Sequence, residues 1–458
     1  MDIKGTILGE IVQYKATWIK ARKKEQPLNT FENLLEPANR HFYNIMRYTE
    51  KSIFILECKK ASPSNGLLCE EFNPIVIANV YRHYASAISV VTDEKYFKGD
   101  FNFIPIISAI VTQPVICKDF IIDPYQIYLA RYYKADAVLL MLSLLNNQQY
   151  CTLAALAHSM KMGVLTEISN AIELKRALEV NAKVIGINNR DLRNFSIDLN
   201  RTRLLAPLLR NTATVISESG IYNYTQIREL RPFVNGFLIG SALMKEKDLM
   251  SSVRRIIMGD NKICGLTRSK DAQVAYAAGS IYGGVIFAKD SFRKINCMYL
   301  QDLIDSAPLK YVCVLRNSTI SEIMSLVSTF QFAVVQLHGN ENKKFVNTLR
   351  EVLPVEVKIW KACNIGQGIL PIRDWLGVDR YVFDNGTGGS GQCFNWSLLA
   401  GEKDLSNVML AGGLNANNCF QAAQLGFSGL DFNSGVEITT GIKDSNKIAE
   451  VFRILRCY

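Results

Sequence analysis

The sequence lacks the cysteine patterns that mark metal sites and disulfide scaffolds. Its eleven cysteines are scattered, with no CxxC pair and no metal-ligand spacing. Several of them, such as Cys58, Cys117 and Cys313, lie inside apolar runs that are typical of strands. This pattern predicts a reduced, intracellular protein. No motif in the chain implies a metal or a redox cofactor, so we expect neither.

Long hydrophobic runs are also missing. The opening MDIKGTILGEIVQYK has no continuous apolar signal core, and the longest apolar stretch, around residues 137–142, is far shorter than a bilayer requires. No low-complexity segment occurs. We therefore expect a cytoplasmic protein with no membrane partner.

A strong charge of one sign is absent as well. A net charge of +10 is mild for 458 residues, and it fits an anionic small substrate as well as it fits nucleic acid. Basic side chains do gather on and after the first predicted helix, and we interpret them as a solvated helix face rather than a nucleic-acid site. They are Lys15, Lys20, Arg22, Lys23 and Lys24.

The chain is too long for one hydrophobic core and is predicted to form two domains, residues 1–256 and 257–458. Each half contains eight short apolar runs that alternate with helix-length segments, which indicates a parallel sheet buried on both faces. In the first half they span residues 53–58, 87–92, 114–120, 137–142, 163–168, 184–189, 214–219 and 236–242. In the second they span residues 262–266, 283–287, 311–315, 333–338, 357–363, 381–385, 408–413 and 430–434. Eight such strands suggest closure, so the predicted fold class is α/β, with two tandem (β/α)₈ barrels.

Additional helices are predicted around these strands. About fifty residues precede the first strand and open with a helical stripe of Ile7, Ile11, Tyr14 and Trp18, which we interpret as an added cap on the first barrel. Residues 248–258 have the pattern of an amphipathic closing helix, and residues 259–261 form the natural break between the domains.

Turns of small residues occur in pairs near the end of each half. Residues 216–220 are paired with 239–241 in the first half, and residues 410–413 with 433–435 in the second. Small residues let the backbone approach several oxygens of one phosphate, and in this fold the loops after the last two strands form such a site. The pairs therefore predict one phosphate site in each barrel and small phosphorylated substrates.

Charged and polar side chains collect where strands of the first half end. They include Glu57, Lys59, Lys118, Glu167, Asn188, Arg190 and Glu218. Side chains from several strands converge at this end of a barrel, so Lys118 and Glu167 could act as general acid and base. A lysine at such a position could equally form a Schiff base, as in class I aldolases, and spacing alone leaves both possibilities open.

Four motifs in the first half closely resemble those of indole-3-glycerol-phosphate synthases. They are ECKKASPS at 57–64, CKDF at 117–120, GINNRDL at 186–192 and SESGI at 217–221. The resemblance implies decarboxylating ring closure of 1-(2-carboxyphenylamino)-1-deoxyribulose 5-phosphate. It also implies that Lys118 is the general acid, that Glu167 serves the dehydration, and that Glu57 and Lys59 complete the catalytic set. Asn65 stands where close relatives have lysine.

The same resemblance implies a substrate-binding set. Asn188, Arg190, Glu218 and Ser219 would position the substrate. Ser62, Gly220, Gly240 and Ser241 would hold its phosphate.

A cysteine and an aspartate end two strands of the second half. A cysteine that acts as a base must be a thiolate, which requires a cationic or helix-end environment. The two-residue strand period puts Lys262 on the same face as Cys264. Asp384 is followed by the glycine-rich residues 386–391, which lack the ending of a P-loop and which we interpret as a mobile lid over the substrate.

Five motifs in the second half resemble phosphoribosylanthranilate isomerases. They are KICGLT at 262–267, QLHG at 336–339, GGSG at 388–391, AGGL at 411–414 and DFNSGVE at 431–437. The resemblance implies an Amadori rearrangement in which Cys264 removes the sugar C2 proton and Asp384 protonates the ring oxygen. The acid then needs a raised pKa and the cysteine a lowered one. Asn395 stands where the family usually has aspartate.

Further residues of the second half are implied to bind substrate. Arg293 would bind the anthranilate carboxylate, and His338 and Asp431 would lie at the site. Gly413, Ser434 and Gly435 would bind phosphate.

The leading hypothesis is therefore a bifunctional enzyme whose second barrel makes the substrate of the first, acting as a monomer on small molecules and not on nucleic acid. Two alternatives remain at this point. One is a pair of sugar-phosphate aldolases with Lys118 as the Schiff-base lysine. The other is a sugar-phosphate sensor that has kept its phosphate sites and lost its chemistry.

Overall fold

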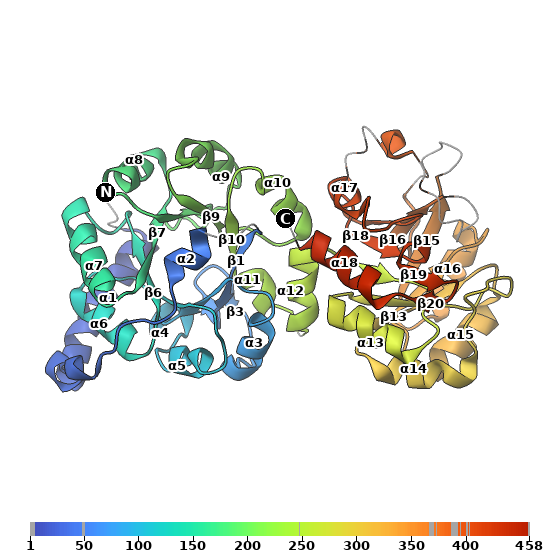
Figure 1. Cartoon of the computed structure of the whole chain (residues 1–458), viewed down its shortest axis with the longest axis horizontal. Helices are drawn as coiled ribbons and strands as arrows, with labels where there is room; N and C mark the ends of the chain where they lie inside the picture. The colour runs from blue at the N-terminus through green and yellow to red at the C-terminus, as the bar shows by residue number, and fades with distance from the viewer. Residues whose placement is uncertain are drawn as a thin grey trace. The chain divides into compact units, whose positions relative to one another are not determined.

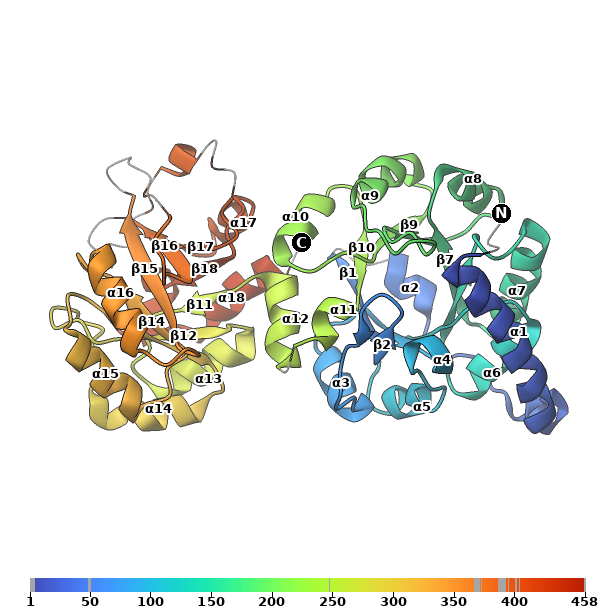
Figure 2. The ribbon, with the colours of Figure 1, turned by 180° about the vertical axis from the view of Figure 1, so that it is seen from behind.

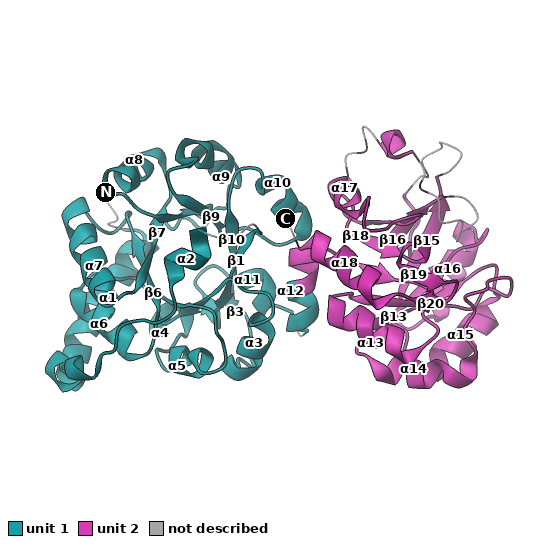
Figure 3. Cartoon of the chain, viewed as in Figure 1, with its two compact units in different colours: residues 1–253, 458 teal, residues 254–457 magenta. Residues whose placement is uncertain are grey.

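Two closed barrels of eight parallel strands make up the chain (Figures 1 and 2). The computed structural model describes residues 5–47, 51–246, 248–365, 371, 373–385, 393, 395–399, 402 and 404–456. The chain divides into two compact units, with the boundary along the chain between residues 253 and 254 (Figure 3). The predicted fold class is confirmed.

The first barrel is closed by pairing of β1 with β10, and its strands follow one another in chain order. The strands are β1 (Ile53–Cys58), β4 (Ala87–Val91), β5 (Val115–Lys118), β6 (Ala137–Met141), β7 (Gly163–Ile168), β8 (Val184–Asn188), β9 (Thr214–Glu218) and β10 (Gly236–Ile239). A small hairpin of β2 (Ala61–Ser62) and β3 (Gly66–Leu67) follows β1. Strands such as β1 and β7 are buried along their whole length, because helices cover the outside of the barrel.

Helices alternate with these strands. They are α1 (Ile7–Glu25), α2 (Phe42–Arg47), α3 (Pro74–Tyr81), α4 (Glu94–Phe97), α5 (Phe103–Ser108), α6 (Pro124–Tyr132), α7 (Asn147–Ser159), α8 (Ala171–Glu179), α9 (Asn200–Leu205), α10 (Tyr224–Leu230), α11 (Ser241–Met244) and α12 (Leu249–Met258). Local sequence fixes where several of them begin, because an Asn or Asp N-cap is followed three residues later by Gln in a capping box at α6, α7 and α10. The predicted closing helix corresponds to α12.

The second barrel is closed by pairing of β11 with β18. Its strands are β11 (Lys262–Ile263), β12 (Tyr282–Ile286), β13 (Lys310–Leu315), β14 (Val334–Leu337), β15 (Lys358–Asn364), β16 (Arg380–Asp384), β17 (Val408–Leu410) and β18 (Gly429–Phe432). A hairpin of β19 (Glu437–Thr439) and β20 (Ile442–Lys443) follows. The helices are α13 (Ser269–Ala278), α14 (Leu300–Ser306), α15 (Ile320–Thr329), α16 (Lys343–Val352), α17 (Cys419–Ala423) and α18 (Ser445–Leu455). In the described ranges, no helix is long and apolar enough to cross a membrane.

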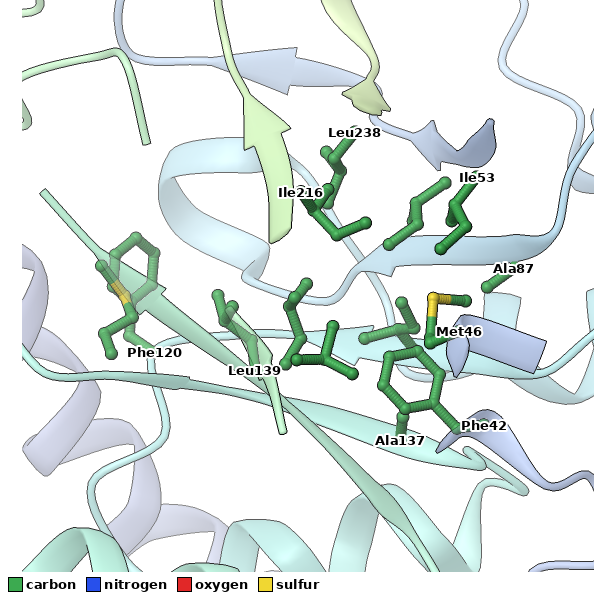
Figure 4. Close-up of a cluster of buried hydrophobic side chains, with 14 of the residues drawn as sticks. Phe42, Met46, Ile53, Ala87, Phe120, Ala137, Leu139, Ile216 and Leu238 are labelled. Carbon is green, nitrogen blue, oxygen red and sulfur yellow. The ribbon is translucent and has the colours of Figure 1, made fainter. Parts of the chain in front are cut away.

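Helix α2 closes the N-terminal end of the first barrel, as the predicted cap requires. Phe42 and Met46 are buried in the cluster that contains Ala87 and Ala137, which begin strands β4 and β6 (Figure 4). A Cβ on Gly163 at the start of β7 would lie 2.3 Å from the Phe42 ring, so the glycine makes room for the aromatic side chain. The functional site is therefore expected at the opposite end of the barrel, where the strands have their C-terminal ends.

The buried face of helix α1 shares only Ile11 with the predicted stripe. Its buried side chains are those of Leu8, Ile11, Lys15 and Ile19, while Tyr14 and Trp18 are only partly covered. The interpretation of Lys15 as a solvated surface residue is wrong. Its ammonium group lies 2.8 Å from carboxylate oxygens of both Asp93 and Asp119 and is 1% exposed.

This buried ion triad gives a stability prediction. Replacing Lys15 with Met leaves Asp93 and Asp119 buried beside each other without a cation, which costs about 3–5 kcal/mol in comparable cases. We expect the Lys15→Met variant to unfold its first barrel at markedly lower denaturant concentration. The matched control is Lys23→Met, because the ion pair of Lys23 with Asp123 is partly exposed and should contribute less than about 1 kcal/mol. Equal effects of the two changes would contradict this account.

Candidate active sites of the two barrels

A cavity opens at the C-terminal ends of the first barrel's strands. The structure brings to its wall every residue that the sequence predicted for this site. These are Glu57, Lys59, Ser62, Lys118, Glu167, Asn188, Arg190, Glu218, Ser219, Gly220, Gly240 and Ser241. Lys118, Asn188 and Glu218 are the last residues of β5, β8 and β9. Convergence of strand ends therefore assembles the site.

Lys118 lies at the centre of three carboxylates. Its Nζ is 3.4 Å from Glu218 Oε2, 3.6 Å from Glu167 Oε2 and 4.0 Å from Glu57 Oε2. Glu57 also forms an ion pair with Lys59. The amide of Asn188 donates to Glu167 Oε1 at 3.0 Å. These contacts fix an ammonium group and three carboxylates within one small volume.

Burial and mutual attraction shift the pKa values of these groups apart. Burial lowers the pKa of Lys118, but the carboxylates of Glu218, Glu167 and Glu57 outweigh it, and the net pKa is raised. Burial, helped by the neighbouring Glu167 and Glu57, raises the pKa of Glu218 to about 8 against the opposing effect of Lys118. Burial also tends to raise the pKa of Glu57, yet Lys59 and Lys118 lower it overall. The site therefore holds a charged lysine, an ionised Glu57 and a protonated Glu218 near neutral pH.

Two glycines make room for these carboxyl groups. A Cβ on Gly186 in β8 would lie 1.8 Å from Glu218 Oε1, and one on Gly240 after β10 would lie 2.3 Å from Glu57 Oε1. Positive φ angles of 64° at Ser219 and 81° at Gly220 form the tight turn after β9. The predicted phosphate-binding segments thus border the same cavity as the charged groups.

The second barrel has a corresponding cavity. Seven of its eight predicted site residues line it, namely Cys264, Arg293, His338, Asp384, Gly413, Asp431 and Ser434. Gly435 does not belong to this lining. Only glycine fits at this position, because a Cβ on residue 435 would lie 2.0 Å from the carbonyl oxygen of Leu414.

Cys264 follows β11 beside a buried ion pair. Lys262 Nζ contacts Asp431 Oδ2 at 2.6 Å and is fully buried. A Cβ on Gly284 would lie 2.8 Å from both Cys264 Sγ and Lys262 Cε, so the thiol and the lysine stem flank the same glycine. Burial raises the pKa of the Cys264 thiol, and the opposing effect of Lys262 does not fully offset it. The expectation of a lowered cysteine pKa is therefore wrong for this arrangement.

His338 lies beside the predicted acid. Its Nε2 is 3.4 Å from Asp384 Oδ2. Lys361 stabilises the loop that carries the histidine. Its Nζ donates to the carbonyl of Gly339 at 2.7 Å and forms an ion pair with Glu341 at 3.0 Å. The structure thus presents His338 and Asp384 together on one wall of the cavity.

Arg293 is held by a partner that the sequence analysis did not identify. Its Nε donates to Glu437 Oε1 and its Nη2 to Glu437 Oε2, each at 2.9 Å. Lys443 Nζ donates to Glu437 Oε1 at 2.8 Å and to Asn433 Oδ1 at 2.9 Å. The bidentate contact with Glu437 orients the guanidinium group of Arg293 at the cavity wall.

Comparison with known proteins assigns each barrel to a family. The family model for indole-3-glycerol phosphate synthase matches residues 8–256, and that for N-(5'-phosphoribosyl)anthranilate isomerase matches residues 261–453. The chain belongs to both families. Curated relatives named tryptophan biosynthesis protein TrpCF cover the whole length: one from Salmonella typhi is 57% identical over 99% of this chain and 100% of its own. Another, from Vibrio cholerae, is 51% identical over 99% of this chain and 96% of its own.

The chain is thus a bifunctional synthase and isomerase of tryptophan biosynthesis. Its C-terminal barrel carries out the Amadori isomerisation of N-(5-phosphoribosyl)anthranilate, and its N-terminal barrel carries out the decarboxylating ring closure to indole-3-glycerol phosphate. The aldolase and sensor alternatives are not favoured, because both halves match the two families over nearly their full length.

Sequence analysis of the synthase barrel missed the apolar wall of its cavity. That wall contains Val91, Phe97, Phe120, Leu139, Met141, Leu192, Phe195 and Ile221. The rings of Phe97 and Phe120 pack with centroids 5.9 Å apart. Apolar residues at strand ends look like ordinary core in a sequence, so only the closed barrel shows that these face the charged groups.

The predicted lid at residues 386–391 lies outside the described residues. Within the part of the chain that the structure describes, no group of three or more His, Cys, Asp or Glu side chains could hold a metal ion.

The shifted carboxyl group of the synthase barrel predicts a pH effect on stability. The pKa of Glu218 rises from 4.5 to about 8 in the folded protein. Between these values the folded barrel keeps a proton that the unfolded chain has lost, so its stability falls as pH rises through this window. Glu218→Gln removes the titrating group, and we expect its unfolding midpoint to change less between about pH 5 and about pH 8 than that of the wild type. Parallel pH profiles in calorimetry would refute the assignment.

Proposed function

We propose that Lys118 is the general acid of ring closure in the synthase barrel. The carbon of the anthranilate ring that bears the carboxylate attacks the keto carbon of the sugar, and Lys118 donates a proton to the forming alkoxide. Loss of CO2 restores the aromatic ring, and loss of water then completes the indole. The position of the Lys118 ammonium group, within 3.6 Å of Glu167 at the cavity wall, is the observation that carries this proposal.

The neighbouring groups have separate tasks in this scheme. Glu167, oriented by Asn188, is placed to exchange the protons of the dehydration. Glu57 and Lys59 keep a compensating pair of charges beside the reacting centre. The raised pKa of Lys118 keeps it charged, which suits a proton donor and disfavours the neutral amine that a Schiff base would require.

In the isomerase barrel, Cys264 is proposed to remove the C2 proton and Asp384 to protonate the ring oxygen. Opening of the furanose ring and the shift to the ketose then follow. The thiol must lose its proton before it can act as a base, and the buried ammonium group of Lys262 stabilises the thiolate that forms. Asp384 lies on the wall of the same cavity, where it contacts His338.

The paired turns of small residues are proposed to bind the phosphate groups of the two substrates. Ser62, Gly220, Gly240 and Ser241 border the synthase cavity, and Gly413 and Ser434 border the isomerase cavity. Their small side chains let backbone N–H groups reach a phosphate. Arg293, held in place by Glu437, is proposed to bind the anthranilate carboxylate.

We also propose that the protein works as a monomer in the cytoplasm, on small phosphorylated substrates and on neither nucleic acid nor membranes. The ten cysteines among the described residues are all free, in keeping with a reducing compartment. Light scattering that gave twice the mass of one chain would refute the monomer.

Both reactions can be followed in one experiment. Purified protein is supplied with phosphoribosylanthranilate, whose fluorescence disappears on isomerisation, and indole-3-glycerol phosphate is measured as the final product. Failure of the first signal would reject the isomerase proposal. Accumulation of the ketose intermediate without indole-3-glycerol phosphate would reject the synthase proposal alone.

Removing the proposed acid of the synthase should uncouple the two steps. We expect Lys118→Ala to lower kcat of ring closure by at least about 100-fold, because general acid catalysis contributes on this scale. The isomerase rate of the same variant should stay at the wild-type value, which controls for protein concentration and for the fold of the second barrel. A wild-type unfolding midpoint of the first barrel controls for the fold around Lys118. A variant that retains near-normal ring closure would remove Lys118 from this role.

The converse result is expected for the isomerase residues. Cys264→Ser and Asp384→Asn should each reduce isomerisation by about 100-fold or more, because each removes one proton-transfer group. Ring closure should be unaffected when the ketose is supplied directly. If either change abolished both activities, the two sites would not be independent.

A further inference from the structure

A buried lysine joins two parts of the wall of the isomerase cavity. Lys443 is the last residue of β20, and its side chain is 1% exposed. Its Nζ donates to Glu437 Oε1 at 2.8 Å, and Glu437 in turn holds Arg293. The same Nζ donates to the backbone carbonyl of Asn433 at 3.2 Å and to its Oδ1 at 2.9 Å. One ammonium group therefore links the arginine to the start of the turn that carries Ser434.

The linked groups differ in what they can reach. Arg293, Asn433 and Ser434 line the cavity, whereas Glu437 and Lys443 do not belong to its lining. The bonds of Arg293 to Glu437 use its Nε and Nη2, which leaves Nη1 on the other edge of the guanidinium group for a ligand. The two buried residues can therefore affect a substrate only through the residues that they hold.

The residue that follows Cys264 packs against the same cluster. Gly265 has a φ angle of +69°. A Cβ at this position would lie 2.8 Å from Asn433 Oδ1, 2.9 Å from Arg293 Cδ and 3.5 Å from Lys443 Nζ. The backbone beside the proposed base thus lies directly against all three side chains, so a shift of the cluster would move the cavity wall relative to that base.

Stability alone does not account for a lysine in this place. Burying an ammonium group costs free energy, and an apolar side chain of similar volume often stabilises a fold as well as a buried ion pair does. An apolar residue would, however, lack the charge. Arg293 and Glu437 form a pair that is neutral on its own, and Lys443 gives the cluster a net positive charge beside a cavity for an anionic substrate.

We propose that Lys443 is a positioning residue of the isomerase that holds the binding groups for both anionic ends of the substrate. The proposal rests on the isomerase function of this barrel. Through Glu437, Lys443 fixes Arg293 and offsets the negative charge that Glu437 would otherwise present to the anthranilate carboxylate. Through Asn433, it fixes the turn at Ser434 for the phosphate. The substrate carries these two groups at opposite ends, so the groups that bind them must be held at a fixed spacing.

Kinetics of a Lys443→Met variant test this role, because methionine fills similar space without a charge or a donor. We expect KM of isomerisation to rise about 10- to 100-fold, since hydrogen bonds to a charged group are lost. The kcat should change much less, because Cys264 and Asp384 remain. Misfolding would instead lower the concentration of active enzyme, and so the apparent kcat, without raising KM.

The matched control is Lys447→Met. Lys447 Nζ donates to the backbone carbonyl of Glu437 at 2.7 Å, so this variant loses a bond to the same hairpin but no contact with Arg293 or Asn433. Its KM should equal that of the wild type. An equal rise in KM in both variants would show that the hairpin, and not the ammonium group of Lys443, is what matters.

Two fragments of the substrate separate the two binding groups. The only anionic group of anthranilate is a carboxylate and that of ribose 5-phosphate is a phosphate, and each is measured as a competitive inhibitor of isomerisation. Lys443→Met should bind both fragments about 10-fold more weakly than the wild type. Asn433→Ala, which removes the side-chain link to the turn, should weaken ribose 5-phosphate alone.

A wild-type KM in Lys443→Met, or weaker binding of only one fragment by that variant, would overturn the proposal. If Lys443→Met does not fold, unchanged affinity of Asn433→Ala for ribose 5-phosphate overturns it. Absence of isomerase activity in the wild type would instead reject the underlying function.

Discussion

An ammonium group held beside carboxylates, mostly buried in Lys118 and fully buried in Lys262, organises the mouth of each barrel. Lys118 contacts three glutamates at the synthase mouth, and Lys262 contacts Asp431 in the isomerase. Removing such charges from water is expensive, and mutual attraction repays the cost only when the geometry is good. Strands that are fixed by a closed sheet supply this geometry, since their ends cannot move apart without breaking the barrel. The charges therefore persist in largely buried sites, where they act most strongly on a substrate.

The two lysines differ in what they can reach. Lys118 lines its cavity, so it can transfer a proton to a substrate. Lys262 is fully buried and does not belong to the cavity lining, so its effect must pass through Cys264 and Asp431, which do. The same ion-pair chemistry thus serves direct proton transfer in one barrel and adjustment of a neighbouring thiol in the other.

The sequence alone predicted most of this architecture, for a physical reason. Strands covered by helices on the outside of a barrel are continuously apolar, and polar residues at their C-terminal ends must converge, so both the strands and the charged groups could be recognised. Contacts between distant segments could not be predicted. Lys15 resembled a solvated helix residue because Asp93 and Asp119, which neutralise it, lie on other elements. The same holds for Arg293, which lies in the turn after β12, and its partner Glu437, which begins β19.

Glycines inside the strands are a signal that sequence analysis could have used. A glycine in a strand costs about 0.5–1 kcal/mol relative to alanine, so its presence away from a turn implies a use for the empty space. Gly186 leaves room for the carboxyl group of Glu218, and Gly284 leaves room for Cys264 and Lys262. In each barrel, one strand therefore has a glycine where a larger side chain would block the space that a reactive group beside it occupies. The position of such a glycine points to the functional residue beside it, even though the glycine itself carries no chemistry.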